Sequence, residues 1–232
     1  MTRRPSVEVF VRAGCPHGSE TIERVREAVA ALDPDWPVQV VELADEATGQ
    51  GHGLRGLPTV RVGGEEVRAD ERGATPIACQ RFGSEGAPAP WMVEAVLLKA
   101  LAPRHILFMC VANSARSQLA EGIARSLAPE GVKISSAGSA PTAVRPEAIA
   151  VLREIGLDIT GHHSKAVADI DASSVDAVIT LCSEEVCPVF LGKVYRLHWG
   201  LPDPAKVEGE ARLEAFRQTR DELRSRLQRV FG

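Results

Sequence analysis

The apolar run at residues 105–109, HILFM, limits the fold of this chain more than any other feature of its sequence. A strand that is apolar at nearly every position has to be covered on both faces, which is typical of a parallel sheet. Further strands are predicted at residues 132–136, 177–181 and 195–198, and helices at residues 118–127, 146–155 and 213–230. This alternation predicts an α/β fold in which helices cover both faces of a parallel sheet.

The residues before this run show a second pattern of strands and helices. SVEVFV at residues 6–11 alternates like a strand, and residues 19–32 place apolar side chains on one helical face. Further strands are predicted at residues 38–43, 59–62 and 65–68, and a helix at residues 91–101. A chain of 232 residues has room for two compact domains. We therefore predict one α/β domain at residues 1–102 and a second at residues 104–232.

The composition narrows the expected partners and location. A net charge of -4 gives no basic surface for a phosphate backbone, so we expect no nucleic-acid partner. No apolar run approaches the ~18 residues of a membrane span, and the start of the chain lacks the apolar core of a signal peptide. We therefore expect a cytoplasmic protein. Five cysteines in such a protein indicate catalytic or redox use, because the cytosol keeps thiols reduced.

The strongest functional signal is the segment CVANSARSQ at residues 110–118, between the buried strand and a helix. Backbone N–H groups in such a loop can bind a tetrahedral oxyanion. Cys110 is expected to be biased toward the thiolate by these groups and by Arg116, and so to act as a nucleophile. Arg116 can offer two parallel hydrogen bonds to the oxyanion. The expected substrate-binding residues are Asn113, Ser114, Ala115 and Ser117, of which Ser117 can also donate to the Cys110 sulfur.

A second candidate lies in the sequence GLPDPA, where Asp203 precedes a proline. A rigid loop of this kind can carry a carboxylic acid to the departing oxygen of the bound oxyanion. Each signal has a simpler interpretation, since a cysteine and an arginine meet this spacing by chance and Asp-Pro is a common turn. The strand before Cys110, the helix after it and the adjoining Ser117 favour the catalytic interpretation.

Together, CX5RS near the start of the domain and Asp-Pro near its end resemble the low-molecular-weight tyrosine phosphatase superfamily. The resemblance spans about residues 104–232. Cys182 and Cys187 in TLCSEEVCP resemble the redox segment of thioredoxin-coupled arsenate reductases within that superfamily. A phosphatase needs neither of these thiols. A pair of structural thiols and half of a zinc site are the other interpretations of Cys182 and Cys187, but no matching cysteine or histidine pair occurs elsewhere.

The resemblance implies reduction of arsenate to arsenite for arsenic detoxification. Cys110 would attack arsenate with Asp203 as proton donor, Cys182 would then attack Cys110, and Cys187 would attack Cys182. It implies no tightly bound cofactor, thioredoxin or an equivalent thiol as electron donor, and phosphate or sulfate as competing oxyanions. Members of this type can bind potassium near the loop, and the candidate oxygen ligands by position are Asn113, Glu121 and Ser136.

Two other functions remain open for this domain. A protein tyrosine phosphatase would use the same loop, although such enzymes flank their pocket with aromatic residues and this domain offers few. An oxyanion-sensing module would keep Arg116 and the loop but would tolerate the loss of Asp203 and Cys182.

The first domain carries two motifs, Cys15-Pro16-His17-Gly18 after a strand and Gly56-Leu57-Pro58-Thr59 before another. Both resemble the thioredoxin or glutaredoxin fold, in which Pro58 would be the cis-proline that faces the cysteine. Gly18 stands where thioredoxins carry their second cysteine, so a dithiol cycle within this motif is excluded. Cys79 is either a distant resolving thiol or a buried one. The domain can be a tethered redox module that reduces the Cys182–Cys187 disulfide in place of thioredoxin, a docking or dimerisation domain, or a monothiol binder of arsenite or another thiophilic species.

Overall fold

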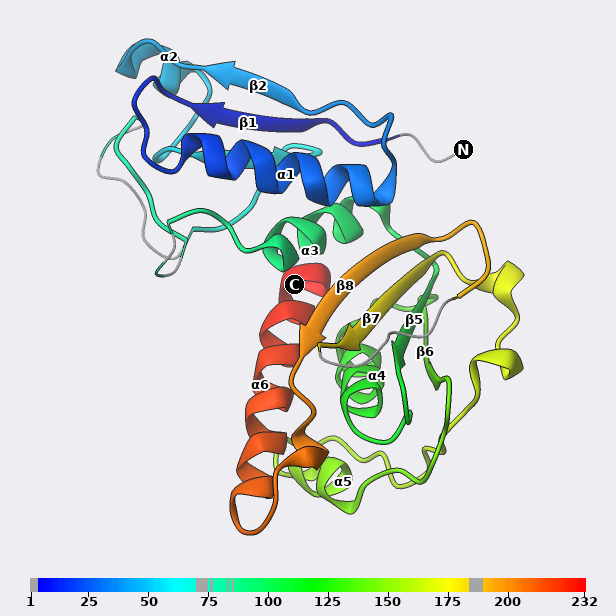
Figure 1. Cartoon of the computed structure of the whole chain (residues 1–232). Helices are drawn as coiled ribbons and strands as arrows, with labels where there is room; N and C mark the ends of the chain where they lie inside the picture. The colour runs from blue at the N-terminus through cyan, green and yellow to red at the C-terminus, as the bar shows by residue number, and fades with distance from the viewer. Residues whose placement is uncertain (1–3, 70–74, 76, 83, 85, 184–189) are drawn as a thin grey trace. The chain divides into compact units, whose positions relative to one another are not determined.

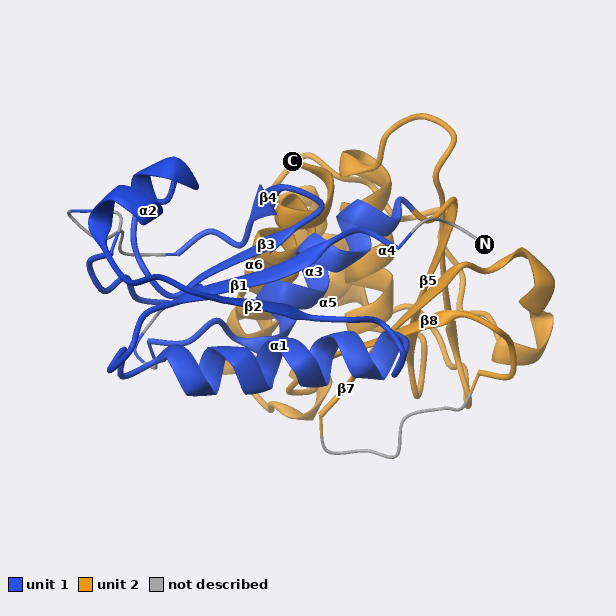
Figure 2. Cartoon of the chain, turned by 90° about the horizontal axis from the view of Figure 1, so that it is seen from above, with its two compact units in different colours: residues 1–102 blue, residues 103–232 orange. Residues whose placement is uncertain are grey.

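The computed structural model describes residues 4–69, 75, 77–82, 84, 86–183 and 190–232. The chain divides into two compact units, Met1–Ala102 and Pro103–Gly232, which are coloured separately in Figure 2. Each unit contains its own sheet of four strands.

The first unit has a mixed sheet (Figure 1). Its strand order is β2-β1-β3-β4, in which β1 runs parallel to β2 and antiparallel to β3, and β3 runs antiparallel to β4. The elements are β1 (Val7–Val11), α1 (Gly18–Leu32), β2 (Gln39–Glu42), α2 (Glu46–Gly51), β3 (Thr59–Val62), β4 (Glu65–Glu66) and α3 (Pro90–Leu101). The predicted strands and the two predicted helices are confirmed with small shifts of their ends, whereas α2 was not predicted.

Helix α1 packs against β1 and α3 through the face that carries Thr21, Val25 and Val29, all of which are buried. The short helix α2 begins after Asp45, whose side chain accepts a hydrogen bond from the backbone N–H of Thr48 at 2.8 Å. This cap satisfies one of the N–H groups that the first turn of a helix leaves without a partner.

The second unit contains a fully parallel sheet with the strand order β6-β5-β7-β8. Its strands and α-helices are β5 (His105–Cys110), α4 (Arg116–Leu127), β6 (Lys133–Gly138), α5 (Pro146–Arg153), β7 (Ala177–Cys182), β8 (Tyr195–Leu201) and α6 (Ala211–Phe231). Three 3-10 turns, η1 (Val167–Asp169), η2 (Ala172–Ser174) and η3 (Pro204–Lys206), complete it. The prediction of a parallel sheet is confirmed.

Strand β5 is buried at all six positions, as the apolar run predicted. Alternate side chains of a strand point to opposite faces of the sheet. Leu107 and Met109 pack in a cluster that side chains from η1 and η2 cover, while α4 packs against β5, β6 and α6. Helical segments therefore flank the sheet, and its strand ends are held in a fixed register.

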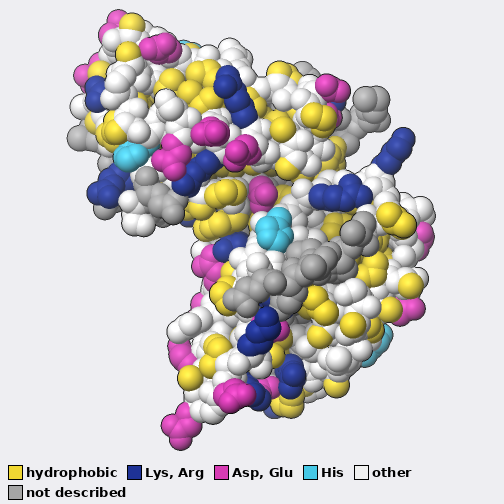
Figure 3. All heavy atoms as spheres, in the orientation of Figure 1, with side chains coloured by type: hydrophobic (Ala, Val, Ile, Leu, Met, Phe, Trp, Pro, Cys, Tyr) yellow, Lys and Arg dark blue, Asp and Glu magenta, His cyan; other side chains and the backbone are white. Residues whose placement is uncertain are grey.

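Acidic and basic side chains are interspersed over the face of the molecule in Figure 3. Among the helices that the structure describes, none is both long enough and apolar enough to cross a lipid bilayer.

Candidate active site

The candidate nucleophile Cys110 is the last residue of β5, and Arg116 is the first residue of α4. The five residues between them form a tight loop at the carboxyl end of the sheet. The side chain of Cys110 is 3% exposed and its sulfur lies 2.9 Å from the hydroxyl oxygen of Ser117. The N–H groups in the first turn of α4 have no partner within the helix, so this end of α4 can bind an anion.

Asn113 holds the loop in shape and adopts a positive φ of 47°. Its amide nitrogen donates to the hydroxyl oxygens of Ser117 at 2.9 Å and Ser136 at 2.8 Å. Its side-chain oxygen accepts hydrogen bonds from the backbone N–H of Lys165 at 2.7 Å and from Gln118 at 3.1 Å. Asn113 is fully buried, so these bonds satisfy polar atoms that water cannot reach.

Of the other expected substrate-binding residues, Ser114 and Ala115 are also buried within the loop. The backbone oxygen of Ser114 accepts a hydrogen bond from the N–H of Arg145 at 2.9 Å. Gly138, the last residue of β6, pairs with Cys110 in the sheet. A Cβ atom at Gly138 would lie 2.3 Å from the carbonyl oxygen of Val111, so the loop requires glycine at this position.

Arg116 is 3% exposed and spans the ends of two strands. Its guanidinium donates to the carbonyl oxygen of Leu201 at 3.0 Å and to that of Leu181 at 3.4 Å. It also lies 3.3 Å from the carboxylate of Asp203. The structure thus brings the predicted cation and the predicted acid together, although they are 87 positions apart in the chain.

Asp203 caps the 3-10 turn η3 by accepting a hydrogen bond from the backbone N–H of Ala205 at 3.1 Å. Its second carboxylate oxygen faces Arg116. The Asp203 side chain is 22% exposed. Its carboxyl group therefore remains accessible to solvent, although the anion loop beside it is buried.

Cys182 is the last residue of β7 and is buried. Strands β5 and β7 are neighbours and run parallel, with Met109 opposite Thr180. Cys110 and Cys182 therefore leave the sheet at the same edge. Cys187 lies outside the described residues, so its predicted position stays a prediction.

The candidate potassium ligands Asn113, Ser136 and Glu121 lie in one hydrogen-bonded series, in which Ser136 donates to the carboxylate of Glu121. The Glu121 carboxylate also lies 3.2 Å from the ammonium of Lys165 and 2.5 Å from the guanidinium of Arg125. Two protein cations already balance its single negative charge. The residues present therefore do not fit a bound potassium ion.

Several residues that hold the loop were not predicted. They are Gln118, His162, Ser164 and Lys165, together with Gly138. Ser164 donates to the backbone oxygen of Asn113 at 2.7 Å, and His162 hydrogen-bonds the side chain of Gln118 at 3.0 Å. The register of Gly138 beside Cys110 and the place of Gln118 directly after the loop were the available signals, since the other three residues reach the loop from a distant segment.

In the first unit, the peptide bond between Leu57 and Pro58 is cis, as the sequence predicted. Cys15 lies in the turn between β1 and α1 and is half-buried. Cys79 is exposed, which rules out the interpretation of it as a buried thiol. Cys15 and Cys79 are both free thiols.

Residues 105–231 match the protein family described as low molecular weight phosphotyrosine protein phosphatase. The match covers more than half of the 232 residues. The chain belongs to this family, which confirms the resemblance drawn from residues 110–118 and Asp203.

Individual proteins similar to this chain are named for a specific activity within the family. The chain is 38% identical over 126 residues to an arsenate reductase of Halalkalibacterium halodurans, in a match that covers 53% of this chain and 91% of that protein. It is 36% identical over 126 residues to an arsenate reductase of Bacillus subtilis, with the same two coverages of 53% and 91%. A solved structure described as an arsenate reductase in the oxidized state is 32% identical, covers 55% of this chain and 96% of its own, and has a TM-score of 0.49.

Proposed function

We propose that the chain is an arsenate reductase that acts in the cytoplasm in arsenic detoxification, with thioredoxin or an equivalent thiol as electron donor. The observation that carries the proposal is the placement of two cysteines, Cys110 and Cys182, at the carboxyl ends of neighbouring parallel strands. Hydrolysis of a phosphate ester needs only the first of them. The identity of 38% to a protein named arsenate reductase supports the same conclusion.

The anion loop supplies the substrate site. An arsenate ion above Cys110 would meet the N–H groups of the loop and of the first turn of α4. The guanidinium of Arg116 would rotate so that two of its N–H groups donate hydrogen bonds to two arsenate oxygens. The spacing of these donors matches that of two oxygens of a tetrahedral oxyanion. Phosphate and sulfate share this geometry and are expected to compete.

The first chemical step forms a bond between sulfur and arsenic. The thiolate of Cys110 attacks arsenic, and one arsenate oxygen leaves as water after it takes a proton from Asp203. Asp203 is suited to this role because its carboxyl group lies at the rim of the loop and beside Arg116.

The second step reduces arsenic by two electrons. The thiolate of Cys182 attacks the Cys110 sulfur, the sulfur–arsenic bond breaks, and its electron pair stays on arsenic as arsenite departs. Cys187 then attacks the Cys182 sulfur, which releases the Cys110 thiolate and leaves a Cys182–Cys187 disulfide. An external dithiol reduces that disulfide and returns the enzyme to its starting state.

The first unit would be a thioredoxin-like domain. Its β1–α1–β2 unit with a parallel strand pair, followed by an antiparallel β3–β4 hairpin, supports this resemblance. In that fold the domain would serve as a redox module or as a docking domain.

The test is arsenite production from arsenate by the full chain with thioredoxin, thioredoxin reductase and NADPH. We expect turnover by the wild type and none above background by Cys182→Ser. The matched control is Ser183→Ala, which removes a neighbouring exposed hydroxyl and should keep turnover within about threefold of wild type, as is typical of surface changes.

A phosphatase would give a different pattern. If neither the wild type nor Cys182→Ser makes arsenite while both hydrolyse an aryl phosphate equally, the reductase proposal is wrong. Weak aryl phosphate hydrolysis alongside arsenite production is consistent with the proposal. The loop binds any anion of similar tetrahedral shape and charge, and a phosphate ester carries such a group.

A further inference from the structure

Cys15 and Cys79 belong to different segments of the first unit but lie at the same end of its sheet. Strand β3 pairs with β1 so that Phe10 faces Thr59. The chain leaves β1 through a turn in which the N–H of Cys15 donates to the carbonyl oxygen of Arg12 at 3.2 Å. Cys15 therefore lies in the turn after the end of β1, at the same end of the sheet as the start of β3.

Cys79 is fixed against the start of β3 by a short parallel bridge to Leu57. The N–H of Leu57 donates to the carbonyl oxygen of Ala78 at 2.8 Å, and the N–H of Gln80 donates to that of Leu57 at 2.8 Å. The side chain of Gln80, which is buried, donates to the carbonyl oxygen of Pro58 at 2.6 Å. The backbone on both sides of Cys79 is therefore held in place.

Across this junction the Cys15 thiol lies close enough to Cys79 to raise the pKa of the Cys79 thiol. Gly18 carries no side chain that could separate them, and a Cβ atom at Gly18 would touch the Cβ of Cys15 at 3.4 Å. Arg12 and Arg81 add positive charge close to Cys79.

We propose that Cys15 and Cys79 form a redox-active dithiol that reduces a disulfide bond of a second molecule. Cys79, supplied by a distant segment, takes the place of the second cysteine that Gly18 excludes from the local motif. This proposal does not rest on the arsenate chemistry of the second unit.

The exchange proceeds in two balanced steps. The Cys15 thiolate attacks one sulfur of the substrate disulfide, which forms a mixed disulfide and releases one thiolate. Cys79 then loses its proton and attacks the Cys15 sulfur, which releases the second thiol and forms the Cys15–Cys79 disulfide. Two electrons and two protons have passed to the substrate.

The order of the two thiols follows from the surroundings of Cys79. Partial desolvation of its otherwise exposed sulfur raises the pKa of Cys79 most, and the nearby Cys15 raises it further, against the smaller opposing effect of Arg12 and Arg81. Cys79 is therefore suited to react second, after Cys15 has attacked the substrate. Once Cys15 is bound in a mixed disulfide its charge is gone, and Cys79 becomes easier to ionise.

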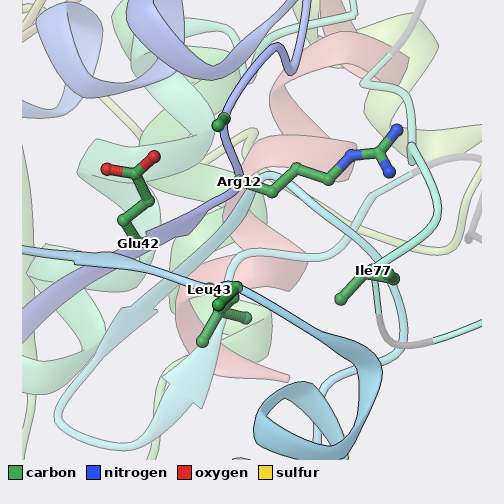
Figure 4. Close-up of a pocket in the computed structure, with 6 residues that line it drawn as sticks. Arg12, Glu42, Leu43 and Ile77 are labelled. Atoms are coloured by element: carbon green, nitrogen blue, oxygen red, sulfur yellow. The ribbon is translucent and has the colours of Figure 1, made fainter.

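A cavity of about 550 Å³ opens at the carboxyl ends of β1 and β2, and its lining includes residues three positions before Cys15 and two positions before Cys79. Arg12, Glu42, Leu43 and Ile77 are among the residues that line it (Figure 4). The Arg12 side chain extends toward the segment of Ile77, two residues before Cys79, whereas Glu42 points away from it. A guanidinium beside a thiol pair favours a disulfide that carries a carboxylate, such as a peptide disulfide.

The test uses the full chain with Cys110, Cys182 and Cys187 replaced by serine, so that Cys15 and Cys79 are the remaining thiols. The protein is equilibrated with mixtures of reduced and oxidised glutathione, quenched in acid and alkylated, and its peptides are mapped by mass spectrometry. We expect a peptide that links Cys15 to Cys79. Urea should lower the linking equilibrium constant at least about tenfold, because the fold supplies the effective concentration of the pair.

Single variants test the order of attack in the same background. Cys79→Ser should accumulate glutathione on Cys15, whereas Cys15→Ser should leave Cys79 largely open to alkylation. Separate glutathione adducts on both cysteines without the linked peptide, or equal linking in folded and unfolded protein, would overturn the proposal. Since the arsenate thiols are absent from these variants, such a failure would leave the proposed reductase activity untouched.

Discussion

The hydroxyl oxygen of Ser117 lies 2.9 Å from the sulfur of Cys110 and at the same time accepts a hydrogen bond from Asn113 at 2.9 Å. Because Asn113 already supplies a hydrogen to the Ser117 oxygen, the hydroxyl hydrogen of Ser117 is left to point at the sulfur. All three residues are buried, so water does not replace this donor. Ser117 therefore stabilises a negative charge on Cys110.

Replacing Ser117 by alanine should slow the reaction of Cys110. A hydrogen bond to a charged group contributes about 1.5–3 kcal/mol, which corresponds to a loss of roughly 10- to 100-fold in kcat/KM for arsenate. The rate of Cys110 alkylation by iodoacetamide at neutral pH should fall in parallel. Ser126→Ala is the matched control on the same helix, since its hydroxyl bonds only the carbonyl oxygen of Ile123 among the described contacts. Equal rates in Ser117→Ala and Ser126→Ala would refute the stabilising role.

Gly138 should be irreplaceable for steric reasons. An alanine Cβ at this position would lie 2.3 Å from the carbonyl oxygen of Val111 and 2.8 Å from the backbone nitrogen of Asn113. Both contacts are backbone atoms of the anion loop, so the loop has to shift. We expect Gly138→Ala to lose phosphate binding and at least about tenfold of kcat/KM, with a lower melting temperature.

The control for Gly138 is Gly161→Ala in the same unit. A Cβ at Gly161 meets no atom within 4 Å, so this variant should bind phosphate like the wild type. Isothermal titration with inorganic phosphate measures both variants, and comparable binding by Gly138→Ala would contradict the steric argument.

Asn113 combines a backbone role with a side-chain role, and two substitutions separate them. Asn113→Gly and Asn113→Ala both remove the bonds to Ser117, Ser136 and Lys165. Only alanine also meets the steric cost of φ 47°, which is about 1–2 kcal/mol in the left-handed region. We expect both variants to be destabilised, with alanine worse than glycine by about 1 kcal/mol after the entropy of glycine is included. Urea unfolding of the two variants measures the difference, and alanine at least as stable as glycine would exclude a backbone role.

Much of the fold was predictable because its signals are local. The apolar run of β5 and the loop at residues 110–118 are each contiguous, so neighbouring residues already specify a buried strand followed by an anion loop. Helix α2 was missed because it has only six residues and two of them are glycines, which are poor helix formers. The Asp45 cap with Thr48 was its one available signal.

The support of the loop was not predictable for the opposite reason. Lys165 bonds Asn113 from 52 positions further along the chain, and Arg116 meets Asp203 only after three more strands, β6, β7 and β8, have been added to the sheet. Such contacts depend on the path of the crossover segments rather than on any short motif. The pairing of Cys15 with Cys79 is of the same kind, since it depends on the bridge between Leu57 and Cys79.

His105 gives the stability of the second unit a predictable dependence on pH. Its ring is buried, with Nε2 2.7 Å from the Ser135 hydroxyl oxygen and Nδ1 3.0 Å from the carbonyl oxygen of Ser174. Burial, and to a lesser degree the charge of Lys133, lowers the pKa of His105. The unfolded chain therefore binds a proton near its ordinary pKa of about 6.5 while the folded chain does not.

Because the unfolded state then binds more protons, the free energy of unfolding must fall as the pH decreases. The contribution of His105 is fully present above about pH 6.5 and is lost as the pH falls toward the lower folded value. His105→Gln cannot titrate, so its free energy of unfolding should depend less steeply on pH between about 7 and 5. Part of the slope should survive, since burial also lowers the pKa of His162. Urea unfolding followed by Trp199 fluorescence, with Trp36 and Trp91 replaced by phenylalanine, isolates the second unit, and an unchanged slope in His105→Gln would show that the imidazole is protonated alike in both states.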